Sequence, residues 1–191
     1  MNAHRRRSAL ALPFALVLVA GCGYNTIQTM DEKVNAAESQ IKVQLQRRAD
    51  LIPNLVETVK GYAKQEQTIF IQVADARAKL AGAVQSGNLE QMATANAALT
   101  APLGRLIAIA ENYPQLKSNE NFRQLQDQLE GTENRIAVAR QDYNESVNTY
   151  NAYIRRFPQV LTAKVLGKKA RPYFELQTPG AAETPKVDFS R

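Results

Sequence analysis

Apolar residues recur at intervals of three and four over most of this chain, which is the spacing of one face of an α-helix. The first run covers residues 27 to 45, where the alternation typical of a strand is absent. The second covers residues 51 to 84 and ends at a Ser86-Gly87-Asn88 stretch. The third covers residues 89 to 113 and contains Pro102, which predicts a kink or a split in that helix.

The fourth run is the most regular pattern in the chain and spans about 36 residues, a helix of about 50 Å at 1.5 Å per residue. Its apolar seam consists of Phe122, Leu125, Leu129, Thr132, Ile136, Ala139, Tyr143, Val147, Tyr150, Ile154 and Phe157. The other helices can cover this seam entirely, or part of it can take a partner helix. Residues 159 to 176 can add a short helix, and residues 177 to 191 predict a flexible tail.

Four such helices with short connections predict an all-α fold, an up-and-down antiparallel four-helix bundle with long helices over residues 27 to 176. We expect the first helix to stop near Arg48, because Asp50 can cap a second helix whose first turn tolerates Pro53. Ile52-Pro53 then marks a helix boundary, and so do the similar pairs Tyr113-Pro114 and Phe157-Pro158.

The first 22 residues have the pattern of a secretory signal, with the basic stretch MNAHRRR before the short apolar run SALALPFALVLVA. That run is broken by Pro13 and is short for a transmembrane helix. The following Val19-Ala20-Gly21-Cys22 resembles the lipobox of bacterial lipoproteins, with Val19 where Leu is usual. The resemblance implies a signal peptide at residues 1 to 21, acylation of Cys22 and a lipid-anchored linker at 22 to 26. An uncleaved signal anchor is the alternative.

Cleavage before Cys22 would change the chemistry that the chain can carry. It removes three of 24 basic residues and leaves 21 against 18 acidic ones, so the net charge falls from +6 to +3. Without a dense basic stripe, nucleic acid is not an expected partner. The single histidine, His4, lies in the signal and the single cysteine is Cys22. The mature domain would therefore lack Ser-His and Cys-His catalysis, His- or Cys-ligated zinc and any disulfide, and we expect no cofactor.

The stretch QLQRRADLIPNLVETVKGY at residues 44 to 62 supplies the candidate binding residues Arg47, Arg48, Asp50 and Asn54. Arginines of this kind can bind a carboxylate or phosphate group at the surface. The alternative is a polar clasp inside the bundle, where these residues meet groups such as those of Arg140, Asn144 and Asn151 on the last helix.

Two further patterns have a chemical and a structural interpretation. A carboxylate-bridged di-metal site would use the glutamates, but such sites need Glu-x-x-His pairs and the mature chain has no histidine. An oxygen-only Ca²⁺ or Mg²⁺ site stays open, although no loop has EF-hand spacing, and no metal site is expected. Tyr143, Tyr150 and Tyr153 lie at seam spacing, which favours core residues over an aromatic ligand cradle.

Several long motifs closely resemble the LemA family: RRADLIPNLVETVKGYA at 47 to 63, ENYPQLKSNENFRQLQDQLEGTENRIAVARQDYNESVNTYN at 111 to 151, and IRRFP at 154 to 158, followed by PYFE and PKVDF. The resemblance covers residues 24 to 189. It implies a four-helix bundle on a bacterial membrane, with the bulk of the protein outside the cytoplasm, and it implies no particular reaction. Members often carry a histidine before Glu66, where this chain has Gln65.

The expected function is therefore that of a non-enzymatic envelope lipoprotein, an adaptor or scaffold for other envelope proteins that is held on the membrane by its lipid anchor. The alternative is a binding module for an anionic lipid or cell-wall ligand that uses the Arg47/Arg48 region. A carboxylate-dependent hydrolase is a third class. Gly23, which follows the cysteine, is not the aspartate linked with inner-membrane retention, and this favours the outer membrane.

Overall fold

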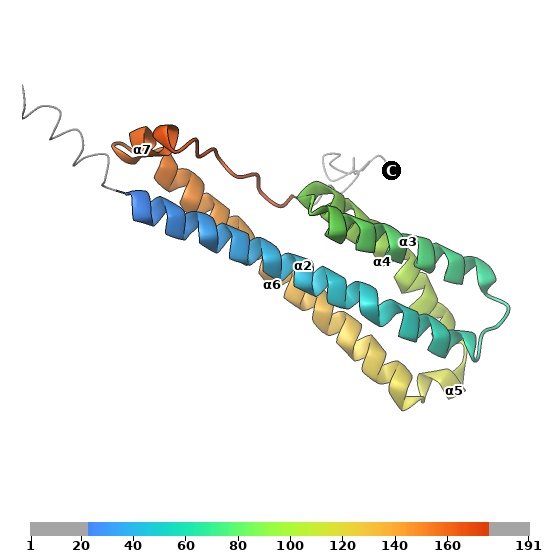
Figure 1. Cartoon of the computed structure of the whole chain (residues 1–191). Helices are drawn as coiled ribbons and strands as arrows, with labels where there is room; N and C mark the ends of the chain where they lie inside the picture. The colour runs from blue at the N-terminus through green and yellow to red at the C-terminus, as the bar shows by residue number, and fades with distance from the viewer. Residues whose placement is uncertain (1–22, 176–191) are drawn as a thin grey trace, which may run out of the picture. The chain divides into compact units, whose positions relative to one another are not determined.

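The computed structural model describes residues 23 to 175, and these residues are almost entirely helical, with no strand among them (Figure 1). The helices are α2 (Tyr24–Lys60), α3 (Gln67–Ser86), α4 (Leu89–Glu111), α5 (Pro114–Lys117), α6 (Glu120–Ile154) and α7 (Gln159–Val165). The predicted all-α class is confirmed. The predicted signal peptide at 1 to 21, Cys22 and the predicted tail at 177 to 191 lie outside the described residues.

The described chain divides into two compact units, and the two longest helices contribute to both. Unit 1 comprises residues 23–41 and 137–173, which include the beginning of α2, the end of α6 and α7. Unit 2 comprises residues 42–136 with 174–175, which include the end of α2, α3, α4, α5 and the beginning of α6.

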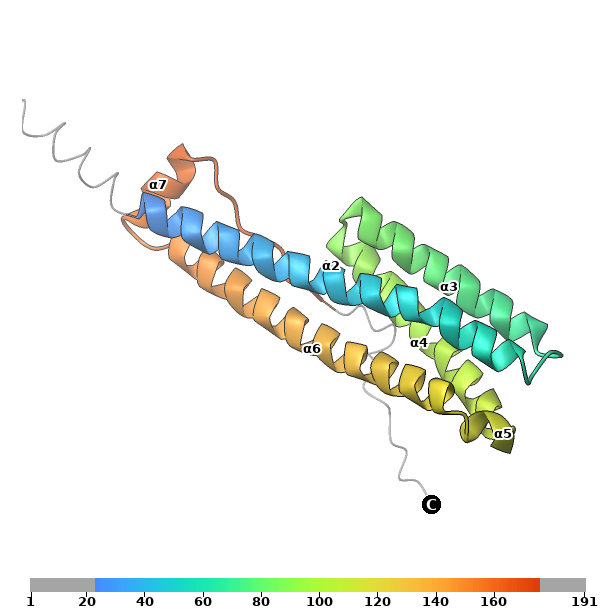
Figure 2. The ribbon, with the colours of Figure 1, turned by 60° about the horizontal axis from the view of Figure 1, so that its bottom comes forward.

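Unit 2 contains segments of the four long helices, with α3 antiparallel to α4 and α2 antiparallel to α6 (Figure 2). Its fully buried apolar side chains include Leu45, Ile52, Leu55, Val59, Leu80, Met92, Leu99 and Leu106. The sharp turn between α3 and α4 follows from two residues. Gly87 adopts φ 69°, where glycine has no steric penalty, and the side chain of Asn88 accepts a hydrogen bond from the backbone N–H of Gln91 at the start of α4. The predicted four-helix arrangement is confirmed.

The expected break near Arg48 is wrong, because α2 runs without interruption through Pro53 to Lys60. Proline lacks the N–H group that would bond to the carbonyl of Ala49 four residues earlier. Nε of Arg77, on α3, donates to that carbonyl at 3.2 Å and replaces the missing helical donor. The carboxylate of Asp50 caps no helix and accepts a hydrogen bond from Nε2 of Gln46 at 2.8 Å. The second predicted helix is consequently divided between the end of α2 and α3.

This contact predicts an energetic coupling between Arg77 and Pro53. We expect Arg77→Ala to reduce the free energy of unfolding by about 1–2 kcal/mol, because it leaves the Ala49 carbonyl without its donor. In a Pro53→Ala background residue 53 regains its own N–H, and the cost of Arg77→Ala is expected to be smaller. Urea unfolding of the four proteins of this double-mutant cycle measures the coupling, and equal costs in both backgrounds would contradict it.

The other proline predictions have mixed outcomes. Pro102 does not split α4, which continues from Leu89 to Glu111. Helix α4 ends just before Tyr113-Pro114, and Pro114 is the first residue of α5, a position where its missing N–H costs nothing. Helix α6 ends at Ile154, just before Phe157-Pro158, and α7 follows as the expected short helix.

Unit 1 is built on the pairing of α2 and α6. Ile27, Val34 and Ile41 are buried on its α2 segment, and Tyr143, Val147, Tyr150 and Ile154 are buried on its α6 segment. Phe157 departs from the predicted seam, because it lies beyond the end of α6 and is 80% exposed. The linker expected at 22 to 26 also differs from the structure, in which α2 begins at Tyr24.

Candidate functional site

The two neighbouring arginines of α2 point in different directions. Successive residues of an α-helix project about 100° apart, so two neighbours can differ sharply in burial. Arg47 is exposed to solvent, whereas Arg48 is 1% exposed and is the largest fully buried side chain in the described part of the chain. The pair predicted as one binding element is therefore divided between the surface and the core of unit 2.

Arg48 ties three helices of unit 2 together. Its Nη1 donates to Oδ1 of Asn96 on α4 at 2.8 Å, and its Nη2 donates to Oε2 of Glu133 on α6 at 3.1 Å. Burial lowers the pKa of Arg48 and the charge of Glu133 partly offsets that effect, but a guanidinium stays protonated at neutral pH. Arg48 thus has the position of the polar clasp, with partners other than the expected Arg140, Asn144 and Asn151.

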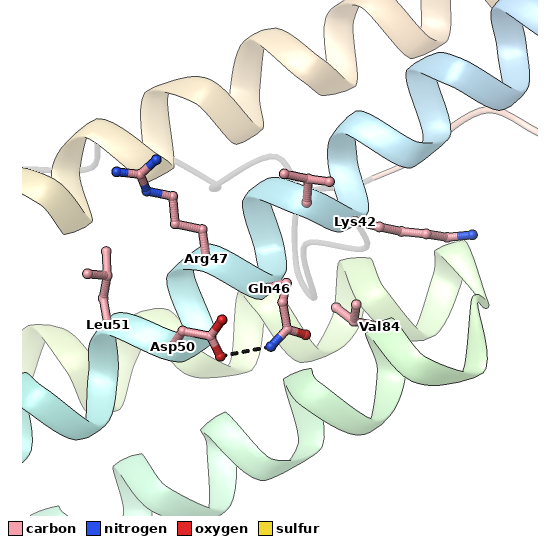
Figure 3. A pocket seen from close by; sticks show the side chains of 7 residues that line it. Lys42, Gln46, Arg47, Asp50, Leu51 and Val84 are labelled. Carbon is pink, nitrogen blue, oxygen red and sulfur yellow. Dashed lines mark hydrogen bonds between the residues drawn. The ribbon is translucent and has the colours of Figure 1, made fainter.

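Arg47 and Asp50 line an open depression of ≈ 600 Å³ on the surface of unit 2 (Figure 3). The full lining consists of Lys42, Val43, Gln46, Arg47, Asp50, Leu51 and Val84. Figure 3 shows the Arg47 guanidinium pointing away from the hydrogen-bonded pair of Gln46 and Asp50. The depression thus offers two cationic side chains, those of Arg47 and Lys42, which can attract an anion. Asn54 is exposed but does not belong to the lining.

A second polar cluster, which the sequence reasoning missed, lies in unit 1 around the buried Asp31 of α2. Oδ2 of Asp31 accepts from Nζ of Lys168 at 2.6 Å, and Oδ1 accepts from Nη2 of Arg171 at 2.9 Å. The same Nη2 also donates to Oδ1 of Asn35 at 2.8 Å. The sequence contained one signal for this cluster. Asp31 follows Ile27 by four residues and precedes Val34 by three, which places an acidic residue on the apolar face of the helix.

The segment around Arg171, which follows α7, is also held through its backbone. Asn151 of α6 accepts from the backbone N–H of Arg171 at 2.8 Å and donates to its carbonyl at 2.9 Å. The hydroxyl of Tyr143 donates to the carbonyl of Pro172 at 2.9 Å. Burial, followed by the charge of Glu38, raises the pKa of Tyr143 to about 12, so this hydroxyl stays protonated. We call residues 168 to 173 the strap.

The structure also bears on the metal site and the tyrosine cradle considered from the sequence, and on whether a described helix could cross a membrane. Within residues 23 to 175, no three His, Cys, Asp or Glu side chains gather where they could hold a metal ion. Tyr143 and Tyr150 are core residues, each 1% exposed, and Tyr153 is half-buried. Among the described helices α4 alone is long and apolar enough to cross a membrane, a test that core helices also pass, and its Met92, Leu99 and Leu106 are fully buried in unit 2.

Comparison with known proteins identifies the family. The sequence model described as "LemA family" matches residues 37–189. The chain is 32% identical over 187 residues to Magnetosome protein MamQ 2 and to Magnetosome protein MamQ 1 of Paramagnetospirillum magneticum, with 86% of this chain and 68% of each relative covered. It is 31% identical, with the same coverage, to Magnetosome protein MamQ of Magnetospirillum gryphiswaldense. This chain therefore belongs to the LemA family.

Proposed function

We propose that this protein is a non-enzymatic envelope lipoprotein that is anchored through Cys22 and acts as an adaptor or scaffold for other envelope proteins. The observation that carries the proposal is the start of α2 at Tyr24, two residues after the predicted acylation site. A helix of 37 residues, about 55 Å long, then begins almost at the anchor. Such a helix can display exposed side chains to partners at a defined distance from the lipid-attached residue.

Three further observations support this proposal. The lipobox-like Val19-Ala20-Gly21-Cys22 supports acylation at the membrane. Membership of the LemA family and the magnetosome proteins among the relatives support a membrane-associated protein without catalytic activity. Finally, the buried charged residues Arg48 and Asp31 are both engaged in bonds that join helices or the strap, which is a structural use of charge.

Crosslinking tests the adaptor role. The full chain is crosslinked in its native membranes, purified after solubilisation in detergent and compared with Arg47→Ala by mass spectrometry of the captured proteins. Because Arg47 is exposed, the variant is expected to melt like the wild type. We expect a reproducible envelope-protein partner with the wild type and a weaker yield of it with the variant. Absence of any reproducible partner with the wild type would contradict the adaptor proposal.

A second candidate function rests on the depression beside Arg47. We propose as the alternative that its two cationic side chains, Lys42 and Arg47, bind an anionic lipid or cell-wall polymer. An exposed electrostatic site of this kind is weakened by salt, because ions screen charges at the surface. The test measures binding of the full chain to purified wall polymer or to anionic vesicles. Binding that weakens as salt is added, and that is weaker again in Arg47→Ala, would favour this function over the adaptor.

A further inference from the structure

The outer surface of α7 carries large apolar side chains where a water-exposed helix usually carries polar ones. Leu161 and Val165, one helical turn apart, are 50% and 86% exposed, and Phe157 in the preceding turn is 80% exposed. The residues of α7 that are buried are the small Thr162 and Ala163. Leu161 and Val165 therefore point outward, and the smaller Thr162 and Ala163 point into unit 1.

The same segment is strongly basic. Between Arg155 and Phe174 the chain contains six basic residues and no acidic residue. The six are Arg155, Arg156, Lys164, Lys168, Lys169 and Arg171. Lys168 and Arg171 bind Asp31, and the other four are exposed and form no ion pair with any described residue. Exposed apolar side chains bordered by basic ones have the composition of a surface that binds anionic membranes.

The start of the described chain lies against this segment, beside α7 (Figures 1 and 2). Gly23 has φ +113°, and a Cβ atom at this position would come within 3.1 Å of both Cγ of Gln159 and the hydroxyl of Tyr153. Its backbone is thus packed against the first residue of α7 and the end of α6. Because Cys22 directly precedes Gly23, a membrane anchor before Gly23 would bring lipid to the same end of unit 1.

We infer that the exposed apolar side chains of Phe157, Leu161 and Val165, here called the α7 face, rest in the headgroup region of an anionic bilayer. The four exposed basic residues then face lipid phosphates. The inference rests on the proposed function in one respect: the segment before Gly23 is membrane-bound, either as acylated Cys22 or as an uncleaved anchor. Unit 1 is held against the bilayer by two attachments, the anchor and the α7 face, and does not hang from the anchor alone.

A fluorescence experiment tests this inference directly, because the chain contains no tryptophan. Leu161→Trp introduces a single probe into the α7 face of the full chain. Val138→Trp is the matched control, since Val138 is 57% exposed and also belongs to unit 1, on α6. Each protein is reconstituted into vesicles of equimolar phosphatidylcholine and phosphatidylglycerol, recovered by flotation and measured with and without brominated acyl chains as quenchers.

We expect the protein to float with the vesicles, and we expect Leu161→Trp to show blue-shifted emission and strong bromine quenching while Val138→Trp shows neither. Flotation with identical emission and quenching for both probes would overturn the inference and leave the proposed anchor intact. A blue shift without bromine quenching would mean that protein covers the α7 face, which also overturns it. Failure to float would overturn both the inference and the proposed anchor.

Charge reversal provides a second test that leaves the apolar residues unchanged. In the Leu161→Trp protein, Arg155→Glu with Lys164→Glu is expected to reduce bromine quenching in the anionic vesicles. The control pair, Arg105→Glu with Arg123→Glu, alters exposed arginines of unit 2 and is expected to leave quenching unchanged. Equal quenching in both pairs would overturn the role of the basic residues in holding the α7 face on the lipid.

Discussion

Replacing Glu133 with alanine is expected to lower the free energy of unfolding by about 2–4 kcal/mol, even though the Glu133 side chain is 54% exposed. Its carboxylate is the counter-charge of the buried Arg48 guanidinium, and only the neutral amide of Asn96 would remain as a described partner. The cost arises because a buried charge without its counter-ion loses hydration with nothing to replace it.

Two controls separate this cause from a general loss of surface charge. Glu130→Ala removes a carboxylate from an exposed position on the same helix and is expected to change stability by less than about 0.5 kcal/mol. Arg48→Met combined with Glu133→Ala removes both charges and is expected to recover part of the loss, because a buried pair can often be replaced by apolar groups. Urea unfolding in detergent measures all of these variants. Equal stability of Glu133→Ala and Glu130→Ala would contradict the clasp.

Replacing Asp31 with alanine is expected to release the strap from unit 1 and to cost about 1–3 kcal/mol. The variant leaves Lys168 and Arg171 close together without the carboxylate that binds both of them. Trypsin cleaves after basic residues, so we expect faster cleavage within residues 168 to 171. Asp142→Ala, an exposed acidic position on α6 in the same unit, is the control and is expected to leave the cleavage rate unchanged.

The bonds to Asp31 also predict a dependence of stability on pH. Burial alone would raise the pKa of Asp31, but hydrogen bonds and charge from Lys168 and Arg171 outweigh burial and hold the pKa of this carboxyl below its ordinary value. A carboxyl whose pKa is lower in the folded state stabilises the fold fully above its unfolded-state pKa. The contribution disappears as the pH falls through the folded-state pKa. We therefore expect the stability difference between wild type and Asp31→Asn to be constant near neutral pH and to shrink as the pH falls below the unfolded-state pKa of a carboxyl and through the lower folded-state pKa of Asp31.

Two apolar-proline pairs show where sequence reasoning succeeds and where it fails. At Tyr113-Pro114 the local rule holds, and Pro114 begins α5. At Ile52-Pro53 the same pattern lies inside a continuous helix, and Arg77 supplies the donor that proline lacks. That donor lies 28 residues from Ala49 along the chain, so no local pattern around Pro53 reveals it.

The spacing of a charged residue from its apolar neighbours along a helix would have predicted its burial better than its residue type did. Arg48 follows Leu45 by three residues and precedes Ile52 by four, which is the spacing of the buried face of α2. The predicted break in that helix hid this continuity and made both arginines candidates for a surface site. The regular seam of α6 was predictable through Ile154, because every three- or four-residue step of it lies on one uninterrupted helix.

Mass spectrometry of the protein purified from membranes tests whether the chain is anchored through acylated Cys22. We predict a mature chain that begins at Cys22 and carries the mass of attached acyl chains, with palmitate label incorporated by the wild type and lost in Cys22→Ser. A purified chain that begins at Met1, or one that begins at Cys22 without added acyl mass, would show that Cys22 is not the lipid anchor.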